Sequence, residues 1–384
     1  MKNANSFQPV KNPDGSIRVA IAGQGRSGYA IHASGLRNKT DKFKIVAVAD
    51  QIPERRQDAI REFGARAYAD YTTLIEKGGF DLFVNALPTP LHVKATIMAL
   101  RAGYHVVCEK PMARIAKEVD KLALAAVRAK RLLAPFQQFR LQPYWLKIQE
   151  IIASGVLGKI VYVRSVWGSF SRRWDWQTLQ CNVGGRLYNT GPHVVDHALM
   201  FFKENEMPKV FCRMYCHDDK LGGDAEDLCA LTLHGKNAPL VEIFLTQYLA
   251  YPQGDKYCIS GTYGGISGNE EQLRWRYYDP AKAPRQPFWE NWSVDRKYPG
   301  ETLPWIEESW HVDENVLKAA TGYTIRSAPA SHALFYDNIY DVLVNHGKLL
   351  ITIPQVRKQI AVIEEAHRQN PLPIRRKHYH GNPQ

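Results

Sequence analysis

Three glycines near the N-terminus have the spacing of a phosphate-binding turn. Gly23, Gly25 and Gly28 form the pattern G-x-G-x-x-G, which follows the apolar run IRVAIAG and precedes a helical pattern. In that setting the first glycine permits a tight turn, the second lets the backbone approach a pyrophosphate, and the third lets helix and strand pack closely. Helix N-terminal amides attract phosphate. The turn, with Arg26 and Ser27 inside it, is therefore a predicted dinucleotide site.

An acidic residue follows at the position where a ribose would be recognised. The second apolar run, FKIVAVAD, ends in Asp50, 22 positions after Gly28. A carboxylate there accepts hydrogen bonds from both ribose hydroxyls and repels a 2′-phosphate, which favours NAD over NADP. Arg55 lies five positions further on. It would stack on adenine, pair with a phosphate or remain a solvated helix residue, and all three interpretations stay open.

Two later strand ends carry polar residues that would border the same ligand. NALPTPLH ends the fourth predicted strand and contains Pro88 and His92, whereas HVVCEKP ends the fifth at Glu109 and Lys110. Ligands of open α/β sheets lie beyond the carboxyl ends of parallel strands. Pro88, His92 and Glu109 are therefore predicted cofactor contacts. Lys110 is predicted to lie where the nicotinamide ring is expected.

The elements that position these residues alternate regularly up to about residue 140. Short apolar runs alternate with amphipathic patterns such as PERRQDAIREFG, HVKATIMALRAG and IAKEVDKLALAAVRAK. This alternation predicts a doubly wound parallel sheet with helices on both faces, over residues 17–140. The polar residues 1–16 are predicted to be a flexible arm.

The pattern changes in residues 141–384, where strand-like runs follow one another directly. Turn residues separate runs at 159–170, 209–218, 227–235, 239–249 and 256–262. Helical patterns are at 143–153, 192–202, 331–345 and 355–368. An α+β domain with an open, mainly antiparallel sheet and helices on one face is expected. The other face would suit a homodimer or homotetramer. Residues 279–310, rich in Pro and Trp, are a predicted surface loop.

The order of these motifs resembles one superfamily. The glycine turn, the acidic strand end, LPTPLH, EKP and then GGRLYNTGPHVVDHAL resemble the Gfo/Idh/MocA oxidoreductases (glucose-fructose oxidoreductase and inositol dehydrogenase) over about residues 17–370. The resemblance implies a Rossmann domain joined to an open-sheet domain, with nicotinamide chemistry on sugars or cyclitols between them. Lys110 and His193 match the family's catalytic lysine and histidine. Asn189 stands where many members carry aspartate. The resemblance therefore implies a group that forms hydrogen bonds but cannot exchange a proton as a carboxylate does.

Two assignments of the proton acceptor are compatible with these residue types. Oxidation of a secondary alcohol requires the hydroxyl proton to leave as hydride moves to the nicotinamide. A neutral His193 accepts protons near neutral pH. Lys110 either stabilises the developing alkoxide or, when desolvation favours its neutral form, accepts the proton itself. We favour His193 as base and Lys110 as electrostatic clamp, and both assignments remain open.

Further substrate contacts are predicted from aromatic and charged residues, because sugar rings offer apolar C–H faces and hydroxyl edges. They are Arg140, Arg172, Arg173, Trp174, Asn189 and Asp196. His193, Asp196 and His197 also spell H-x-x-D-H, in which two histidines share a helix face. The glutamate of the hydrolytic pattern H-E-x-x-H is missing. No metal is therefore expected.

Composition limits the remaining function classes. The chain carries 50 Lys and Arg against 38 Asp and Glu, but the basic residues are interspersed with acidic ones, so nucleic acid is not an expected partner. No apolar run is long enough to span a membrane. Six cysteines without C-x-x-C indicate reduced thiols and a cytoplasmic location. The expected function is an NAD-dependent sugar or cyclitol dehydrogenase. The alternatives are a lyase or glycosidase that oxidises a hydroxyl transiently, or a non-catalytic NAD-dependent sensor.

Overall fold

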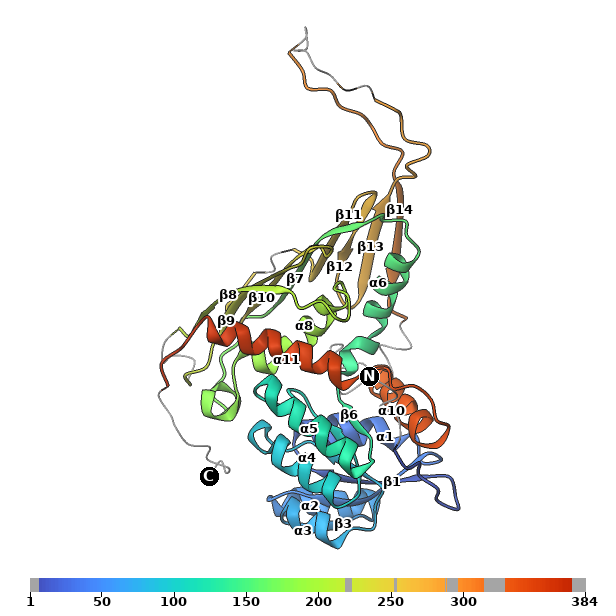
Figure 1. The fold of residues 1–384 in the computed structure, drawn as a ribbon, viewed down its shortest axis with the longest axis vertical. Helices are drawn as coiled ribbons and strands as arrows, with labels where there is room; N and C mark the ends of the chain where they lie inside the picture. The colour runs from blue at the N-terminus through green and yellow to red at the C-terminus, as the bar shows by residue number, and fades with distance from the viewer. Residues whose placement is uncertain are drawn as a thin grey trace.

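Two β-sheets with helices packed on them build the protein (Figure 1). The computed structural model describes residues 7–217, 223–251, 254–286, 288, 296–313 and 329–374. In Figure 1 the smaller sheet lies at the bottom and the larger sheet above it, with α11 (Ile353–Arg368) running between them. Each sheet belongs to one of the two predicted domains.

The N-terminal sheet is parallel and has the strand order β3-β2-β1-β4-β5-β6. β4 and β5 are buried along their whole length, as expected for strands covered by helices on both faces. The order reverses direction between β1 and β4, which places a ligand crevice at their carboxyl ends. The predicted doubly wound sheet is therefore confirmed. Its strands are β1 (Ile17–Ala22), β2 (Phe43–Ala49), β3 (Arg66–Tyr68), β4 (Leu82–Asn85), β5 (His105–Cys108) and β6 (Leu133–Pro135).

Local sequence signals account for where several helices of this domain begin and end. α2 starts with Pro53 in its first turn and stops at Gly64, whose φ of +62° suits glycine. Asp70 caps α3 by accepting a hydrogen bond from the backbone N–H of Thr73. The segment after the glycine turn begins as a π-helix, η1 (Gly28–Ala33). The other helices are α1 (Ser34–Arg37), α2 (Pro53–Phe63), α3 (Tyr71–Lys77), α4 (His92–Arg101) and α5 (Ala116–Ala129).

The C-terminal sheet is mainly antiparallel, as predicted, with the order β14-β13-β12-β11-β7-β10-β9-β8. Only the pairing of β7 with β10 is parallel in the described sheet. Burial alternates along β9 and β10, because one face of the sheet packs on α7 (Arg186–Asn189), α8 (Gly191–Leu199) and α11. α6 (Pro143–Ala153) leads into this domain. Its strands are β7 (Ile160–Gly168), β8 (Lys209–Tyr215), β9 (Leu228–His234), β10 (Leu240–Thr246), β11 (Tyr257–Gly261), β12 (Gly264–Gly268), β13 (Gln272–Tyr277) and β14 (Ile306–His311).

Three strands extend this sheet beyond the sequence-based expectation. β12, β13 and β14 were not predicted, and β14 begins inside the predicted loop 279–310 and ends one residue beyond it. The β14 residues IEESWH are almost all exposed and show no alternation, so only pairing with β13 defines the strand. The connection between β13 and β14 projects from the end of the sheet (Figure 1). Residue 287 and residues 289–295 of it are outside the described part of the chain.

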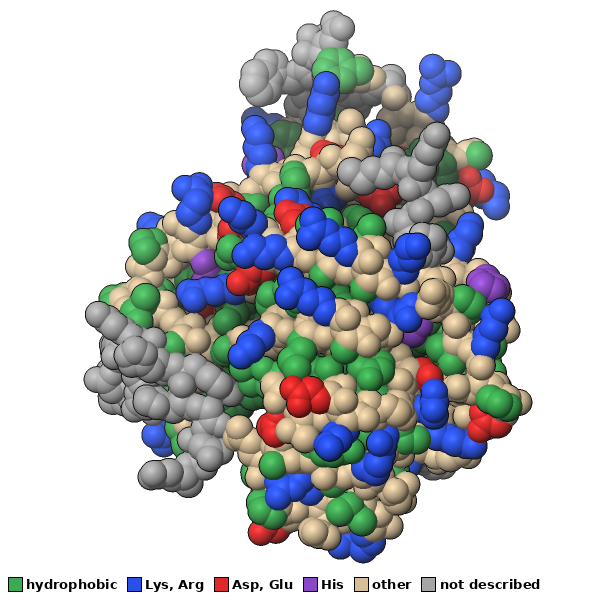
Figure 2. Space-filling view, turned by 60° about the horizontal axis from the view of Figure 1, so that its bottom comes forward, with side chains coloured by type: hydrophobic (Ala, Val, Ile, Leu, Met, Phe, Trp, Pro, Cys, Tyr) green, Lys and Arg blue, Asp and Glu red, His purple; other side chains and the backbone are tan. Residues whose placement is uncertain are grey.

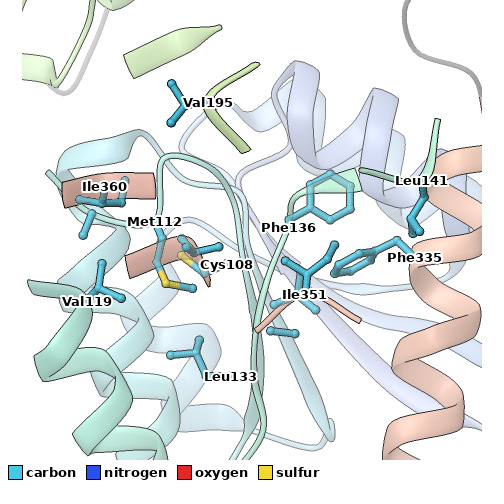
Figure 3. Close-up of a cluster of buried hydrophobic side chains, with 14 of the residues drawn as sticks. Cys108, Met112, Val119, Leu133, Phe136, Leu141, Val195, Phe335, Ile351 and Ile360 are labelled. Atoms are coloured by element: carbon cyan, nitrogen blue, oxygen red, sulfur yellow. The ribbon is translucent and has the colours of Figure 1, made fainter. Parts of the chain in front are cut away.

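The hydrophobic core is continuous between the two sheets. Figure 3 shows Cys108, Met112 and Phe136 of the N-terminal domain close to apolar side chains from the C-terminal part of the chain. Those partners include Phe335 of α10 (Pro329–Val344) and Ile360 of α11. α10 packs on α1, and α11 packs on α5 and β6. Two C-terminal helices thus join the domains.

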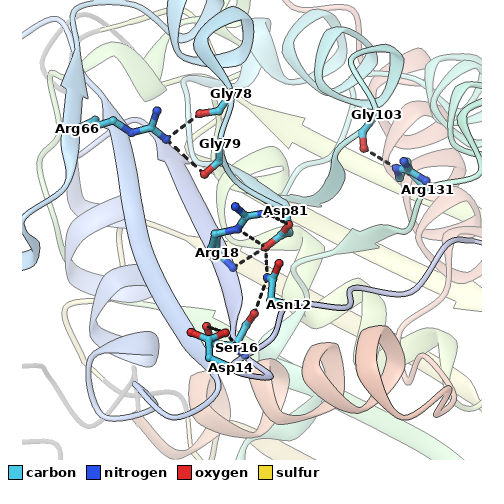
Figure 4. A network of polar contacts seen from close by, with 10 residues as sticks. All are labelled: Asn12, Asp14, Ser16, Arg18, Arg66, Gly78, Gly79, Asp81, Gly103 and Arg131. Carbon is cyan, nitrogen blue, oxygen red and sulfur yellow. Dashed lines mark hydrogen bonds and ion pairs between the residues drawn. The ribbon is translucent and has the colours of Figure 1, made fainter.

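Residues 7–16 do not form the flexible arm expected from their polarity. The backbone N–H groups of Gln8 and Val10 donate to the carbonyls of Lys130 and Leu343. The side chain of Asn12 donates to Asp81 and to the carbonyl of Ser16, both at 2.7 Å (Figure 4). Polar groups that composition alone marks as solvated are paired here across the fold. Residues 1–6 are outside the described part.

The surface carries its positive charge in dispersed form. Figure 2 shows Lys and Arg side chains distributed over the face drawn there, with Asp and Glu between them. Among the described helices, none combines the length and the apolar character needed to cross a membrane.

Candidate active site

A cleft of about 1990 Å³ separates the carboxyl ends of the N-terminal strands from the second sheet. One wall comprises the glycine turn and the ends of β2, β4 and β5. The other comprises the end of β7, residues 169–170 and 173–179 after it, and the segment from α7 into α8. The cleft therefore lies at the ligand position expected for this sheet topology.

The three glycines have distinct structural functions in the turn. A Cβ on Gly23, whose φ is +89°, would lie 2.4 Å from the carbonyl oxygen of Ala86. A Cβ on Gly28 would lie 1.7 Å from the carbonyl oxygen of Gly23. At Gly25, among the described residues other than its chain neighbours, a Cβ would have only Nη1 of Arg55 within 4 Å, at 3.7 Å. The outer glycines therefore permit close packing, and Gly25 leaves the space that a pyrophosphate requires.

The carboxylate of Asp50 is fixed at the edge of the cleft. Its Oδ2 accepts a hydrogen bond from the backbone N–H of Gln24 at 2.7 Å, and its Oδ1 accepts one from Ile52 at 2.9 Å. Nη1 of Arg55 lies 3.5 Å from Oδ2. Arg55 is thus paired with Asp50 at the cleft edge. Two backbone N–H groups therefore hold the carboxylate in one orientation.

His92 connects the turns that follow β4 and β5. Its ring nitrogens lie 2.8 Å from the carbonyl oxygens of Leu87 and Pro111. Both His92 and Pro88 line the cleft. Burial lowers the pKa of His92, whereas the two carbonyl oxygens oppose that shift.

Glu109 joins the glycine turn to the end of β5. It accepts hydrogen bonds from the Ser27 hydroxyl and from the backbone N–H of Lys110, and Nε2 of His32 lies 3.3 Å from it. Burial alone would raise the pKa of Glu109, but His32, the Lys110 ammonium and Ser27 lower it to about 2. A buried, ionised carboxylate therefore stands behind Lys110.

Lys110 reaches from the first domain to the second. Its Nζ donates to the carbonyl oxygen of Asn189 at 3.0 Å. Burial lowers the pKa of Lys110, Glu109 opposes that shift, and the positive charges of Arg26 and Arg173 add to it. The neutral form of the Lys110 amine is consequently easier to reach by loss of a proton than in a solvated lysine.

His193, at the start of α8, lines the same cleft as Lys110. Its ring stacks on Phe139 with centroids 3.9 Å apart. Its Nδ1 lies 3.2 Å from Nε2 of Gln137, which also donates to the carbonyl oxygen of Pro192 at 3.0 Å. Burial lowers the pKa of His193 well below its usual value, and the nearby charge of Lys110 lowers it further. The imidazole is therefore neutral at neutral pH.

Comparison with known proteins identifies the family. Residues 17–136 match the model described as "Oxidoreductase family, NAD-binding Rossmann fold", and residues 145–267 match the GFO/IDH/MocA C-terminal domain. The chain belongs to the Gfo/Idh/MocA family. Its first domain is accordingly an NAD-binding Rossmann domain, and the space at Gly25 with the carboxylate of Asp50 fits that cofactor.

Relatives of this Gfo/Idh/MocA protein include named dehydrogenases. The scyllo-inositol 2-dehydrogenase (NADP(+)) of Bacillus subtilis is 26% identical over 91% of this chain and 93% of its own length. The D-glucoside 3-dehydrogenase of Escherichia coli is 29% identical over 52% of this chain and 56% of its own. Among solved structures, the WlbA dehydrogenase of Chromobacterium violaceum, in complex with NADH and UDP-GlcNAcA, has a TM-score of 0.72 at 20% identity, covering 94% of this chain and 96% of its own.

Two predicted substrate contacts of this family member pair with each other instead. Nε of Arg140 donates to Asp196 at 2.9 Å, and Nη1 donates to Gln355 at 2.6 Å. Neither Arg140 nor Asp196 is among the described residues that line the cleft, and the exposed Arg172 also lies outside that lining. Arg140 lies in the segment after β6, and Asp196 lies in α8. Their ion pair therefore connects these two parts of the chain. The prediction that they touch substrate does not agree with this placement.

The two histidines of the H-x-x-D-H pattern have different surroundings in this family member. Nδ1 of His197 lies 2.9 Å from the hydroxyl of Tyr257, and Nε2 lies 3.1 Å from the carbonyl oxygen of Phe139. The ring stacks on Trp145 with centroids 3.8 Å apart. His197 is therefore a core residue, and it does not face the cleft with His193.

The remaining predicted contacts do line the cleft, together with residues that sequence reasoning missed. Arg173 pairs with Asp175 at 2.7 Å, and Trp174 and Asn189 are beside it in the lining. Unpredicted residues of the cleft wall include Gln138, Arg186, Lys256 and Glu270. Gln137, behind His193, was missed as well. The run FQQF contains it, but no spacing in the sequence connects that run to His193.

Proposed function

We propose that the protein is an NAD-dependent dehydrogenase that transfers hydride between the nicotinamide and a secondary hydroxyl of a sugar, sugar derivative or cyclitol. The observation that carries this proposal is the position of Lys110 and His193. His193 is buried and Lys110 is half-buried, and both line one cleft that the glycine turn and Asp50 also line. Relatives named for scyllo-inositol and for a D-glucoside support the substrate class.

The chain's own residues would bind and orient the substrate. The bound nicotinamide supplies the hydride acceptor. Lys110 and His193 provide two polar groups for the reacting oxygen, in a site where burial strengthens each hydrogen bond. The aromatic residues of the lining offer faces for the C–H groups of a ring. They are Trp167, Phe170, Trp174 and Trp176.

We further propose that NAD is preferred over NADP. The carboxylate of Asp50 is held by Gln24 and Ile52 where the adenosine ribose is expected, and its charge disfavours a 2′-phosphate. Arg55 is paired with this carboxylate, which reduces its capacity to bind that phosphate. The Bacillus subtilis relative is named for NADP(+), so the preference requires a direct measurement.

Self-association through the outer face of the second sheet is also proposed. Phe211 and Tyr215 of β8 are 60% and 51% exposed, and Leu240 of β10 is 43% exposed, on the face opposite the helices. Exposed apolar side chains of this kind mark interaction surfaces. Sedimentation velocity is expected to show a dimer or tetramer.

One experiment tests the enzymatic proposal. The purified protein is incubated with NAD and a panel of sugars, cyclitols and glycosides, while NADH absorbance and product masses are followed. Formation of NADH with a product two hydrogens lighter supports the proposal. Product without net NADH would instead indicate elimination after transient oxidation, and no turnover of any compound would contradict both activities.

Lys110→Met is the variant for this test, with the exposed Lys121→Met as its matched control. Loss of the amine is expected to slow hydride transfer on the order of 10³-fold. NAD affinity should stay within a few fold, because the glycine turn and Asp50 are unchanged. A normal single-turnover rate for Lys110→Met would refute the assignment of Lys110.

A further inference from the structure

The side chain of Gln137 lies within hydrogen-bonding distance of the His193 ring. Gln137 is 1% exposed and lies between β6 and η3 (Gln138–Leu141). Its Nε2 lies 3.0 Å from the carbonyl oxygen of Pro192 and 3.2 Å from Nδ1 of His193. A carbonyl oxygen only accepts hydrogen bonds, so the amide nitrogen has to face Pro192.

The reverse orientation of this amide is unfavourable. It would place Oε1 of Gln137 against the oxygen of Pro192, two acceptors at hydrogen-bonding distance. Nε2 of Gln359 donates to the same carbonyl at 2.6 Å, so that oxygen is a shared acceptor for two amides. With its orientation determined in this way, Gln137 offers its second N–H to His193. Nδ1 is then the acceptor, and a neutral ring carries its hydrogen on Nε2.

We infer that Gln137 holds His193 as the Nε2–H tautomer, so that His193 donates a hydrogen bond to the substrate oxygen and Lys110 accepts the hydroxyl proton. This inference rests on the proposed function and deepens it. It reverses the assignment favoured from the sequence, in which His193 is the base. Gln137 is a positioning residue, because it acts through His193.

The surroundings of His193 support a donor. The ring lines the cleft, and no described residue hydrogen-bonds to its Nε2. An imidazole with hydrogen on Nε2 has its lone pair on Nδ1, which faces Gln137. Besides burial, the charges that bear on this ring are those of Lys110, Glu109, His197 and Lys256. Burial is the largest cause that lowers the pKa of His193, and Lys256 adds to it, so protonation of the ring is disfavoured even when Lys110 is neutral.

The surroundings of Lys110 support an acceptor. Burial lowers its pKa, Arg26 and Arg173 add to that shift, and Glu109 opposes it. In the step proposed, the O–H bond of the substrate breaks and its proton goes to the lone pair of Nζ, forming the ammonium. The carbon that bears this hydroxyl loses its hydrogen, with the electron pair of the C–H bond, as hydride to the oxidised dinucleotide. The resulting C=O oxygen accepts the hydrogen bond from Nε2 of His193.

The tautomer is tested by NMR on histidine-¹⁵N-labelled protein, with and without NAD. Two-bond ¹H–¹⁵N correlations report which ring nitrogen is protonated, and His193→Asn identifies the signal. The Nε2–H pattern is expected throughout the neutral pH range. Gln137→Met should convert it to a mixture of tautomers. Gln359→Met, which removes a donor to the same Pro192 oxygen but no contact with His193, should leave it unchanged.

An Nδ1–H pattern in the wild type, or titration of His193 near neutral pH, would overturn the inference. So would an unchanged tautomer in a folded Gln137→Met variant. These readouts need no substrate. They therefore remain decisive if the panel of sugars and cyclitols shows no activity, which would refute the proposed function alone.

The proton acceptor is tested by chemical rescue of Lys110→Ala with small primary amines. If Lys110 is the base, the rescued rate of alcohol oxidation should follow the concentration of free amine and rise with pH. If the rate follows the ammonium form instead, Lys110 is an electrostatic clamp and the assignment is wrong. NAD affinity and thermal melting of the variant show whether it is folded. An absence of rescue in a folded variant also contradicts the assignment of Lys110 as the base.

Discussion

At the scale of single residues, the polar groups of the cleft are organised by contacts within the chain. Two backbone amides orient Asp50, and Ser27 and His32 hold Glu109. Such preorganisation lets a charged group bind a ligand without first losing its own freedom. The effects of substitutions at these two carboxylates can therefore be stated separately.

Replacing Asp50 should change the choice of cofactor. Asp50→Asn keeps the shape but removes the charge, so NAD affinity is expected to fall about tenfold and discrimination against NADP to weaken. Calorimetric titration with both dinucleotides measures this. Asp58→Asn, at the exposed pair with Arg61, is the control and should bind like the wild type. Unchanged selectivity in Asp50→Asn would show that another residue reads the ribose.

The carboxylate of Glu109 should make folding stability sensitive to acid. Its folded-state pKa of about 2 lies below the usual 4.5, so its contribution is present above pH 4.5 and is lost as pH falls towards 2. Urea unfolding of the wild type and Glu109→Gln at pH 7 and at pH 4 tests this. The stability difference between the two proteins is expected to shrink at the lower pH. An equal difference at both pH values would contradict it.

At the scale of elements, the glycine turn combines two constraints that mutation should separate. Gly28→Ala places a Cβ 1.7 Å from the carbonyl of Gly23, and the expected cost is about 3 kcal/mol of folding free energy or more. Gly25→Ala places a Cβ in ordinary contact with Arg55, 3.7 Å from its Nη1, so it should fold like the wild type and lose NAD affinity. Urea unfolding and NAD titration of both variants check this. A stable Gly28→Ala protein would disprove the packing argument.

Elements with a strong local pattern could be predicted from the sequence, and those without one could not. The N-terminal strands are apolar because both faces are covered, and α6 was predicted at its observed bounds, 143–153. β12 contains three glycines in five residues, and β14 is largely exposed. Both depend on hydrogen bonds to neighbouring strands, so their own residues show neither alternation nor a buried run.

At the scale of the whole molecule, the ion pair of Arg140 and Asp196 joins the segment after β6 to the second domain. The Asp196 side chain is 2% exposed, so its charge depends on Arg140 for compensation. Arg140→Met should destabilise the protein by about 3–5 kcal/mol in urea unfolding. The double variant Arg140→Met/Asp196→Leu should recover much of that loss. If the single variant is as stable as the wild type, the pair does not join the domains.

The sequence by itself determined the cofactor half of this protein. A strand, a glycine turn, a helix and an acidic strand end are local features whose spacing along the chain is the signal, so Gly25, Asp50 and Lys110 could be identified before any coordinates. The family resemblance added His193, which the structure brings to the same cleft.

Only the tertiary structure decided which groups surround Lys110 and His193, the proposed catalytic pair. Gln137 meets His193 across 56 positions, and Arg140 meets Asp196 across the same separation. Asn189, beside His193 in the sequence, instead presents its backbone carbonyl to Lys110. Contacts between distant segments depend on how two sheets and two C-terminal helices pack, and they leave no periodic pattern in the chain. The protonation of His193 follows from such a contact, so residue types alone left it open.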